Sequence, residues 1–573
     1  MTTHGAGPVR AAPEAADNPG ACPVSGRAWP WPDRLPNPGI AGFTHFLRTP
    51  TQAETFKLDG ADPRDDLPKL RTAMARLANA MTAGTDAVQD PASRENHGLP
   101  SGYTYLLQFI AHDLVQTSIP FWALDERSPA VQNDRTARLR LDALYGGGPN
   151  VCPAVFAPDD PSDTTRTKLR VGPVGLDPGG DAAQKRPLRD LVRVGVASDN
   201  AIAAGPQRLA DPLIADPRND DHAIISQLTT LFHQFHNAVI DEIWRPKPAT
   251  ATVALTEAQR RYACAREAVT LVYREIIRRD VMPRLLHQSV RDLIDTAGSA
   301  AIAAIGRSRS GEAGMPLEFS HGAFRFGHAM VRQHYKIGDH SFDLDQVLNQ
   351  NSHLLPRSMP LVPKWIVHWS NFFVIDGSTP NFSLKLSPTF SDGLLDDRSF
   401  GEIDATATSG LAYRDLMSAA LAGLWSVDSL IEALRAAFPE LIDGTPILAD
   451  KQHRADLLHD WFSRHNLGDA AAALAQDPPL LFFVLFEAEN DSISAGTTLG
   501  VLGSLIVASV IYLALDGDPL PTETAAAGLP GRLQALTQRL YGDNRLDAIN
   551  GITSMAALVK YVAPGQQTPP AFI

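Results

Sequence analysis

Two long segments with the periodicity of an amphipathic helix lie close together in the middle of this chain, at residues 222–244 and 256–279. Within each segment, apolar residues recur at steps of three and four, so they line one face of a helix that must be buried against other elements. We expect the second helix to end before Pro283, because proline lacks the N–H that a helix interior uses. Alternating strand patterns are scarce elsewhere. The sequence therefore predicts a mainly α fold.

Shorter helices and long irregular segments complete the expected architecture. The shorter helices are predicted at residues 69–83, 103–114, 409–424, 427–437 and 500–515. Ser101 is suited to be the N-cap of the helix at 103–114, because a serine hydroxyl accepts hydrogen bonds from the free N–H groups of a first turn. Residues 146–190, rich in Gly, Pro and Asp, are predicted to form a long irregular excursion. Pro-rich loops are predicted over residues 351–400.

The chain is expected to form one large domain behind an N-terminal arm. Residues 1–40 are rich in Ala, Pro, Gly and Asp without periodicity, which indicates an arm that is flexible or draped over the surface. A length of 573 residues would suffice for roughly two to four domains. No linker and no internal repeat is visible beyond the arm, so residues 41–573 are predicted to be a single large helical domain with long irregular loops.

Composition argues against several classes of partner and location. A net charge of −13 disfavours binding to nucleic acid or to anionic membranes. Three cysteines without a C-x-x-C pair do not make a disulfide framework. The N-terminal residues lack the basic and apolar regions of a secretory signal, so we expect a cytoplasmic protein. The apolar run at residues 499–515 is short for a membrane span and is expected to be a buried core helix.

The first of three motifs with chemically useful residues is QFIAHD, at residues 108–113. Gln108 and His112 are four residues apart and share one face of the predicted helix. A histidine and an amide that face one cavity could transfer and orient a proton. The alternative is an ordinary hydrogen-bonded histidine in the core. Motifs for a phosphate loop, a zinc helix or a serine nucleophile elbow are absent from the sequence.

The other two motifs are DPRNDDH, at residues 216–222, and FRFGH, at residues 324–328. The first of these motifs is fully explained as the capping segment at the start of a helix. Alternatively, Arg218 would lie at a cavity, where its guanidinium would stabilise developing negative charge. In the second motif, a glycine beside His328 would allow a flat ligand to approach the backbone, and Arg325 could pair with a carboxylate. The alternative is a loop with a surface arginine.

In this order and spacing, the motifs resemble those of the animal haem peroxidases (the peroxidase–cyclooxygenase superfamily, with myeloperoxidase and its bacterial relatives). The similar segments are YLLQFIAHDL at 105–114, DPR at 216–218, the helix with Leu231, Phe232, His236 and Asn237, FRFGH at 324–328, LAYRDL at 411–416, and residues 499–508. The resemblance covers about residues 70 to 515. It implies a haem peroxidase-like catalytic domain.

The resemblance also implies a role for each matching residue. His112 would take a proton from bound peroxide and return it to the departing oxygen, and Arg218 would stabilise charge as the O–O bond breaks. Gln108 would orient peroxide or a small anion. His328 would bind the haem iron, and Arg325 would meet a haem propionate.

Two departures from the family pattern concern the haem. The family usually has asparagine where this chain has Asp415, and we expect Asp415 to accept a hydrogen bond from His328, which would lower the reduction potential. Mammalian members esterify the haem through two carboxylates. One of these positions is Ala111 here and the other is Asp221, which is one methylene shorter than the usual Glu. The resemblance therefore implies a largely noncovalent haem b that oxidises bromide, iodide or phenolic donors rather than chloride.

A third departure concerns the family's calcium site. Asp113, Thr136 and Asp142 match ligand positions of that site, but Arg140 stands where another ligating Asp is expected. A guanidinium repels a calcium ion, so we expect Arg140 to replace the ion and to pair with Asp113. The alternative is that Arg140 points to solvent and a degenerate calcium site persists.

The function implied by the resemblance is a peroxidase that reduces hydrogen peroxide and oxidises a small organic or halide donor. Two alternatives are a haem-dependent oxygenase of a lipid or biosynthetic intermediate and a non-catalytic haem-binding protein. Val367 occupies the position of the radical-forming tyrosine of the fatty-acid oxygenases, which argues against a cyclooxygenase-like mechanism. His233 and His236 are expected to have core or cap roles rather than to bind a metal. Asp392, Asp396 and Asp397 are expected to mark a solvated loop.

Overall fold

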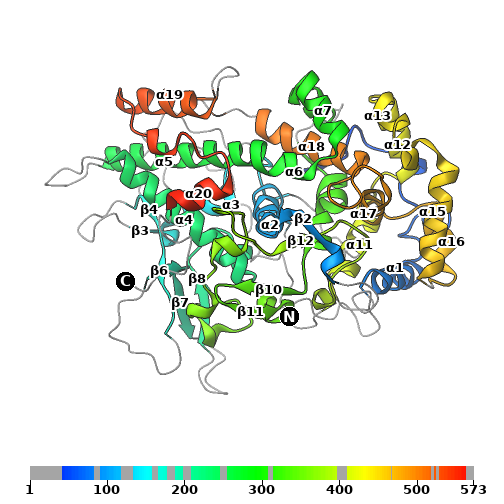
Figure 1. The fold of residues 1–573 in the computed structure, drawn as a ribbon, viewed down its shortest axis with the longest axis horizontal. Coiled ribbons are helices and arrows are strands. Elements are labelled where there is room, and N and C mark those ends of the chain that lie inside the picture. Colours follow the sequence, from blue (N-terminus) through cyan, green and yellow to red (C-terminus); the bar gives the residue numbers. More distant parts are fainter. Residues whose placement is uncertain are drawn as a thin grey trace, which may run out of the picture.

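The computed structural model describes residues 42–82, 91–117, 133–157, 166–176, 187–197, 208–244, 255–306, 314–395, 410–465, 467–517, 520, 522–523 and 528–562. Helices dominate these residues, and the strands are short, so the predicted mainly α fold is confirmed. The predicted N-terminal arm and Asp396 and Asp397 lie outside the described residues. The short strands within residues 156–212 lie at one end of the molecule. The helices at residues 67–82, 427–435, 439–443, 451–464 and 470–476 lie at the other (Figure 1).

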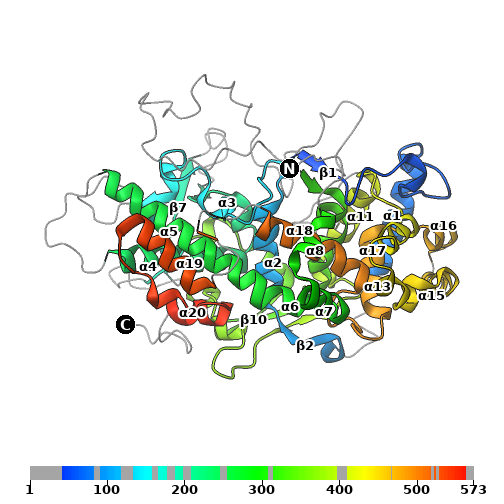
Figure 2. The same cartoon turned by 90° about the horizontal axis from the view of Figure 1, so that it is seen from above.

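The two long central helices form as predicted. They are α4, Ala223–Ile243, and α5, Leu255–Ile276, and they pack against each other. Helix α19, Leu529–Tyr541, lies along α5 (Figures 1 and 2).

The predicted end before Pro283 is wrong. Helix α5 continues through a π-helical turn, η8 (Ile277–Val281), into α6 (Met282–Leu285), so the helical backbone passes the proline. Pro283 is tolerated there because it lies in the first turn of α6, where a backbone N–H has no partner within that helix.

The five shorter predicted helices are also present. They are α1 (Leu67–Thr82), α2 (Gly102–Leu114), α11 (Leu411–Leu421), α12 (Val427–Arg435) and α18 (Val501–Asp516). Helix α2 is almost entirely buried and lies near the centre of the molecule in both views (Figures 1 and 2). Ser101 occupies its N-cap position, but the expected capping bond is absent, since the hydroxyl makes no hydrogen bond there.

Several helices were not predicted. They are α19, named above, and α3 (Asp142–Tyr145), α7 (Gln288–Ala297), α8 (Ser299–Gly306), α9 (Leu344–Asn349), α13 (Pro439–Asp443), α14 (Pro446–Ala449), α15 (Lys451–Arg464), α16 (Ala470–Gln476), α17 (Leu480–Asn490) and α20 (Met555–Val562). Many are too short to show a period. Helix α17 is apolar on all sides along most of its length and packs in the core against α11 and α18, and a helix buried all round has no polar face to reveal it.

The strands form two-stranded pairs. The pairs are β1 (Gly42–Thr44) with β9 (Gly314–Pro316), β2 (Glu95–Pro100) with β12 (Phe382–Leu384), β3 (Phe156–Ala157) with β4 (Lys168–Leu169), β5 (Gly172–Pro173) with β6 (Leu188–Asp190), β7 (Arg193–Ala197) with β8 (Arg208–Pro212), and β10 (His334–Ile337) with β11 (His340–Asp343). The excursion at 146–190 is therefore not wholly irregular, because it contains β3 to β6. Residues 351–395 contain β12 and short 3₁₀ turns, as expected for Pro-rich loops.

The apolar run at 499–515 is a core helix, as predicted. Nearly all residues of α18 are buried, and the helix packs against α8 and α17. Among the described residues, no single helix is long and apolar enough to cross a membrane. The pair α16 and α17, bent by 76°, meets that test of length and composition only when the two helices are taken together.

A buried carboxylate joins α17 to the start of α18. Glu487 accepts hydrogen bonds from the N–H groups of Leu502 (2.7 Å) and Gly503 (3.1 Å), which have no partner within the helix. Burial raises the pKa of Glu487 to about 8, despite the two amide donors. The side chain is therefore protonated at neutral pH in the folded protein and ionised in the unfolded chain.

Glu487→Gln is expected to become more stable relative to the wild type as the pH rises from 5 to 8. A raised carboxyl pKa gives stability that is present at low pH and is lost as the pH rises through the folded-state value. The relative change should approach about 1.4 kcal/mol for each pH unit in this window. Free energies of unfolding in urea at pH 5, 7 and 9 measure it. The exposed Glu440→Gln is the control, and a pH-independent difference for Glu487→Gln would contradict the prediction.

Candidate active site

The residues singled out by the three motifs meet around one cavity. Its volume is about 320 Å³, and its wall includes Gln108, His112, Arg218, Asp221, Arg325, His328 and Asp415. Helix α2 and the segment formed by η7 (Pro217–Asp220) and α4 supply the side that we call distal. The π-helical turn η9 (Glu318–Gly322), the 3₁₀ helix η10 (Ala323–Met330) and α11 supply the proximal side.

His112 is buried on the distal wall and is neutral at pH 7. Its Nδ1 donates a hydrogen bond to Oδ1 of Asn219 at 2.9 Å. Burial, and then the charge of Arg218, lower the pKa of His112 to about 4. A neutral imidazole with one nitrogen already used as a donor can accept a proton at the other, Nε2.

Gln108 is held by a histidine that the sequence analysis did not assign to the site. His222 caps α4 by accepting the N–H of Ile225 at Nδ1 (3.3 Å), so its Nε2 carries the proton and donates to Oε1 of Gln108 (2.9 Å). The oxygen of the Gln108 amide is therefore occupied, which leaves its NH₂ group as the donor. Both Gln108 and His222 line the cavity.

Arg218 lines the cavity, but most of its donors are used by the protein. Its Nε and one Nη donate to Asp216, and its Nη atoms also donate to the carbonyl oxygens of Val115 (2.8 Å) and His112 (2.9 Å). Arg218 therefore ties η7 to the end of α2. Its positive charge adds to burial in lowering the pKa of His112.

The carboxylate of Asp415 organises the proximal wall. His328 donates from Nδ1 to Oδ2 of Asp415 at 2.5 Å, which is the hydrogen bond expected from the sequence. Arg325 donates to the other oxygen of Asp415 and, from Nε, to the carbonyl of Ser320 (3.2 Å). Burial alone would raise the pKa of Asp415, but His328 and Arg325 hold it below its usual range. Arg325 is thus placed against Asp415 in this structure, whereas the sequence analysis assigned it to a propionate.

The site fits a haem. Because Nδ1 of His328 is bound to Asp415, Nε2 is the nitrogen available to an iron. A Cβ placed on the neighbouring Gly327 would meet no atom within 4 Å, so there is open space beside the histidine for a flat group. His112 and Gln108 on α2 line the same cavity.

The expected pairing of Arg140 with Asp113 is wrong. Asp113 accepts hydrogen bonds from the backbone N–H groups of Leu141 (2.9 Å) and Ala143 (3.3 Å) rather than from Arg140. Arg140 is itself buried, so the alternative in which it points to solvent is wrong as well.

The residues at this position do not fit a calcium ion either. Thr136 donates to Asp142 at 2.8 Å, and Arg266 donates to the same carboxylate at 3.3 Å. Amide hydrogens and a guanidinium thus point at the carboxylates where calcium needs oxygen ligands. Among the described residues, no group of three or more His, Cys, Asp or Glu side chains is placed to hold a metal ion.

His233 and His236 have the core roles expected of them. Both are buried on α4 and bond to backbone carbonyls, His233 to Arg170 (2.8 Å) and His236 to Thr167 (2.9 Å).

The sequence analysis missed Asn219 and His222 as site residues. Both lie in the segment DPRNDDH that was singled out for Arg218. The signals that could have identified them are the amide directly after Arg218 and the histidine at the start of the next helix.

Part of the chain matches a known protein family. Residues 187–368 match the family model described as animal haem peroxidase. The resemblance to the animal haem peroxidases is confirmed. The matched segment contains Arg218 and His328, while His112 and Asp415 lie outside it.

Among solved structures, Peroxidase A from Dictyostelium discoideum is similar to this chain, with 13% sequence identity and a TM-score of 0.49 over 91% of this chain and 94% of that chain. No curated protein sequence matches significantly.

Asp415→Ala is expected to destabilise the haem-free protein by about 2 kcal/mol, because two charged or polar donors lose their acceptor. The loss should stay below that of a fully buried ion pair, since Arg325 keeps some access to water. Asp415→Asn keeps an acceptor for His328 and should lose less. Unfolding in urea measures both variants, and equal losses would show that the hydrogen bond to His328 contributes nothing.

Proposed function

We propose that this chain is a haem peroxidase that reduces hydrogen peroxide and oxidises a small organic or halide donor. One observation carries the proposal. A neutral histidine on α2, His112, and a carboxylate-bound histidine on η10, His328, line the same cavity. The first arrangement suits proton transfer, and the second suits a ligand to iron. The match to the animal haem peroxidase family supports the same reading.

His328 would hold the haem iron through Nε2. Asp415 fixes the ring by accepting from Nδ1 and raises the basicity of the imidazole. When bound, the haem supplies the redox-active iron that passes electrons to peroxide. Ala111 has no carboxylate with which to form an ester, so we propose a largely noncovalent haem b. Asp221 lines the cavity and is the remaining carboxylate at a family ester position.

The distal residues would move one proton. Nε2 of His112 would accept a proton from hydrogen peroxide and return it to the departing oxygen, which leaves as water. The NH₂ group of Gln108, whose oxygen is occupied by His222, would donate a hydrogen bond that orients the peroxide. Arg218 would contribute its charge from the wall rather than through a freely pointing guanidinium.

The electron-rich proximal ligand favours mild oxidation. A carboxylate partner makes an imidazole a stronger donor, which lowers the reduction potential of a bound iron. We therefore propose bromide, iodide or phenolic donors and not chloride. Oxygen uptake with a fatty acid in the absence of peroxide would instead identify an oxygenase.

His328→Ala is expected to abolish stable haem binding, and His112→Ala is expected to retain it. With one equivalent of hydrogen peroxide, the Soret absorption of the haem-loaded wild type should change rapidly. In His112→Ala this change should be slower by a factor of about 10²–10⁴, because a positioned acid–base group contributes that much. Haem titration and stopped-flow absorption measure the two effects. Haem that ignores peroxide in the wild type would refute the proposed function.

The rate of the peroxide reaction should fall as the pH falls through about 4. The pKa of His112 is lowered to about 4, so the neutral form that accepts a proton predominates above this value. Below it, the rate should drop about tenfold for each pH unit. Stopped-flow measurements from pH 3.5 to 7 test this. His112→Ala is the control, because it should lack this step in its profile.

A further inference from the structure

The buried side chain of Asn219 bonds at both ends, and this determines which nitrogen of His112 carries a proton. Its Nδ2 donates to the carbonyl oxygen of Ala143 at 3.2 Å. A carbonyl can only accept, so the amide nitrogen must face Ala143 and Oδ1 must face His112. Oδ1 can only accept as well. The 2.9 Å contact therefore requires a proton on Nδ1 of His112, which leaves Nε2 as the acceptor.

The partner that orients Asn219 is attached to the helix that carries His112. The N–H of Ala143 donates to Asp113, the residue next to His112. Ala143 thus bonds through its N–H to α2 and through its carbonyl to Asn219. His112, Asp113, Ala143 and Asn219 therefore form a closed ring, which consists of three hydrogen bonds and the peptide link between His112 and Asp113. Such a ring resists rotation of the amide.

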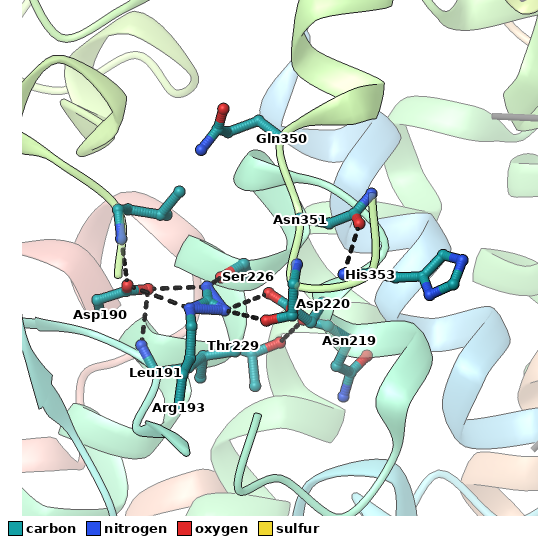
Figure 3. A network of polar contacts seen from close by, with 12 residues as sticks. Asp190, Leu191, Arg193, Asn219, Asp220, Ser226, Thr229, Gln350, Asn351 and His353 are labelled. Atoms are coloured by element: carbon teal, nitrogen blue, oxygen red, sulfur yellow. Dashed lines mark hydrogen bonds and ion pairs between the residues drawn. The ribbon is translucent and has the colours of Figure 1, made fainter. Parts of the chain in front are cut away.

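The backbone of Asn219 is held by a buried ion network (Figure 3). Arg193, with 2% of its side chain exposed, pairs with Asp190 and with Asp220, the residue after Asn219. Asp220 also accepts the N–H of Ser352 at 3.1 Å. Removing any one partner from a buried network leaves a charge without compensation, so the network keeps η7 in one position.

A second contact holds the peptide of Asn219 itself. The single hydroxyl hydrogen of Thr229 on α4 is shared between the carbonyl of Ile225 (2.9 Å) and the carbonyl oxygen of Asn219 (3.3 Å) (Figure 3). Both the side chain and the backbone of Asn219 are therefore fixed by other parts of the fold. An asparagine constrained in this way fits a residue that orients a neighbour rather than one that only fills space.

We propose that Asn219 is a positioning residue that keeps the proton of His112 on Nδ1, so that Nε2 accepts the proton of an incoming ligand. This inference rests on the proposed function. Without Asn219, the imidazole is free to adopt the other tautomer, in which Nε2 carries the proton and cannot accept one. The haem-holding residues His328 and Asp415 are not touched by the change.

Cyanide is a probe for this role because hydrocyanic acid must lose its proton when it binds a ferric haem. A distal histidine with a free Nε2 takes up that proton. In the ferric haem-loaded protein at pH 7, Asn219→Leu is expected to slow cyanide association about 10²-fold, close to the effect of His112→Ala. Asn219→Asp retains an acceptor for Nδ1 and should restore most of the rate. It should also move the pH step of His112 upward, because a carboxylate favours the charged imidazole.

A matched control separates orientation from stability. Asn237, on α4, bridges the N–H and the carbonyl of Leu169 with both ends of its amide, each at 2.8 Å. Asn237 does not line the cavity. Asn237→Leu should therefore lower the melting temperature without changing the cyanide rate.

The outcomes distinguish the two proposals. If His112→Ala slows cyanide and a folded, haem-loaded Asn219→Leu does not, the role of Asn219 is overturned and the proposed function stands. If His112→Ala itself leaves the cyanide rate unchanged, the proposed distal chemistry fails. If Asn219→Leu does not fold, Asn219→Asp still decides, because an unshifted pH step in that variant overturns the role of Asn219.

Discussion

The charge of Asp415 has no access to water, and the proximal side of the cavity depends on how it is balanced. A buried carboxylate is tolerated when its oxygens are paired, and here one faces His328 and the other faces Arg325. Arg325 compensates the negative charge of Asp415. The carboxylate can therefore fix the ring orientation of His328 without being an unpaired buried anion. The same interaction joins η10 to α11, two segments about 90 residues apart along the chain.

The distal side meets the same requirement with neutral groups. His112 is buried near Arg218, so its charged form is disfavoured, and its Nδ1 faces an amide rather than a carboxylate. A carboxylate partner stabilises an imidazole that carries or binds positive charge, while an amide does so much less. His328 is therefore suited to hold a cation permanently, and His112 is suited to take up a proton and release it. The chemical difference between the two histidines arises from the partners of their Nδ1 atoms together with the burial of His112 near Arg218.

The sequence predicted the identity of the site residues better than their partners. Helical spacing places Gln108 and His112 on one face, and the position of Asp415 in LAYRDL indicated the bond to His328, which is present. Arg218 was expected to aim at the cavity, but it bonds to Asp216 and to carbonyls at the end of α2, about 100 residues earlier. Such contacts depend on how η7 packs against α2, and no local sequence pattern predicts that packing. Pro283 shows the same limit, because its effect depends on where a helical turn begins.

Arg140 shows why a motif does not determine whether a side chain or the backbone supplies a partner. The loop before α3 places Ala137, Leu139 and Leu141 at positive φ, a conformation that non-glycine residues rarely adopt. Nothing in the identity of an alanine and two leucines predicts it. The turn directs the N–H groups of Leu141 and Ala143 at Asp113, and these backbone groups take the place in which the guanidinium of Arg140 was expected. The carbonyl of Ala143 then bonds to Asn219, so the unpredicted backbone of this loop also fixes the distal histidine.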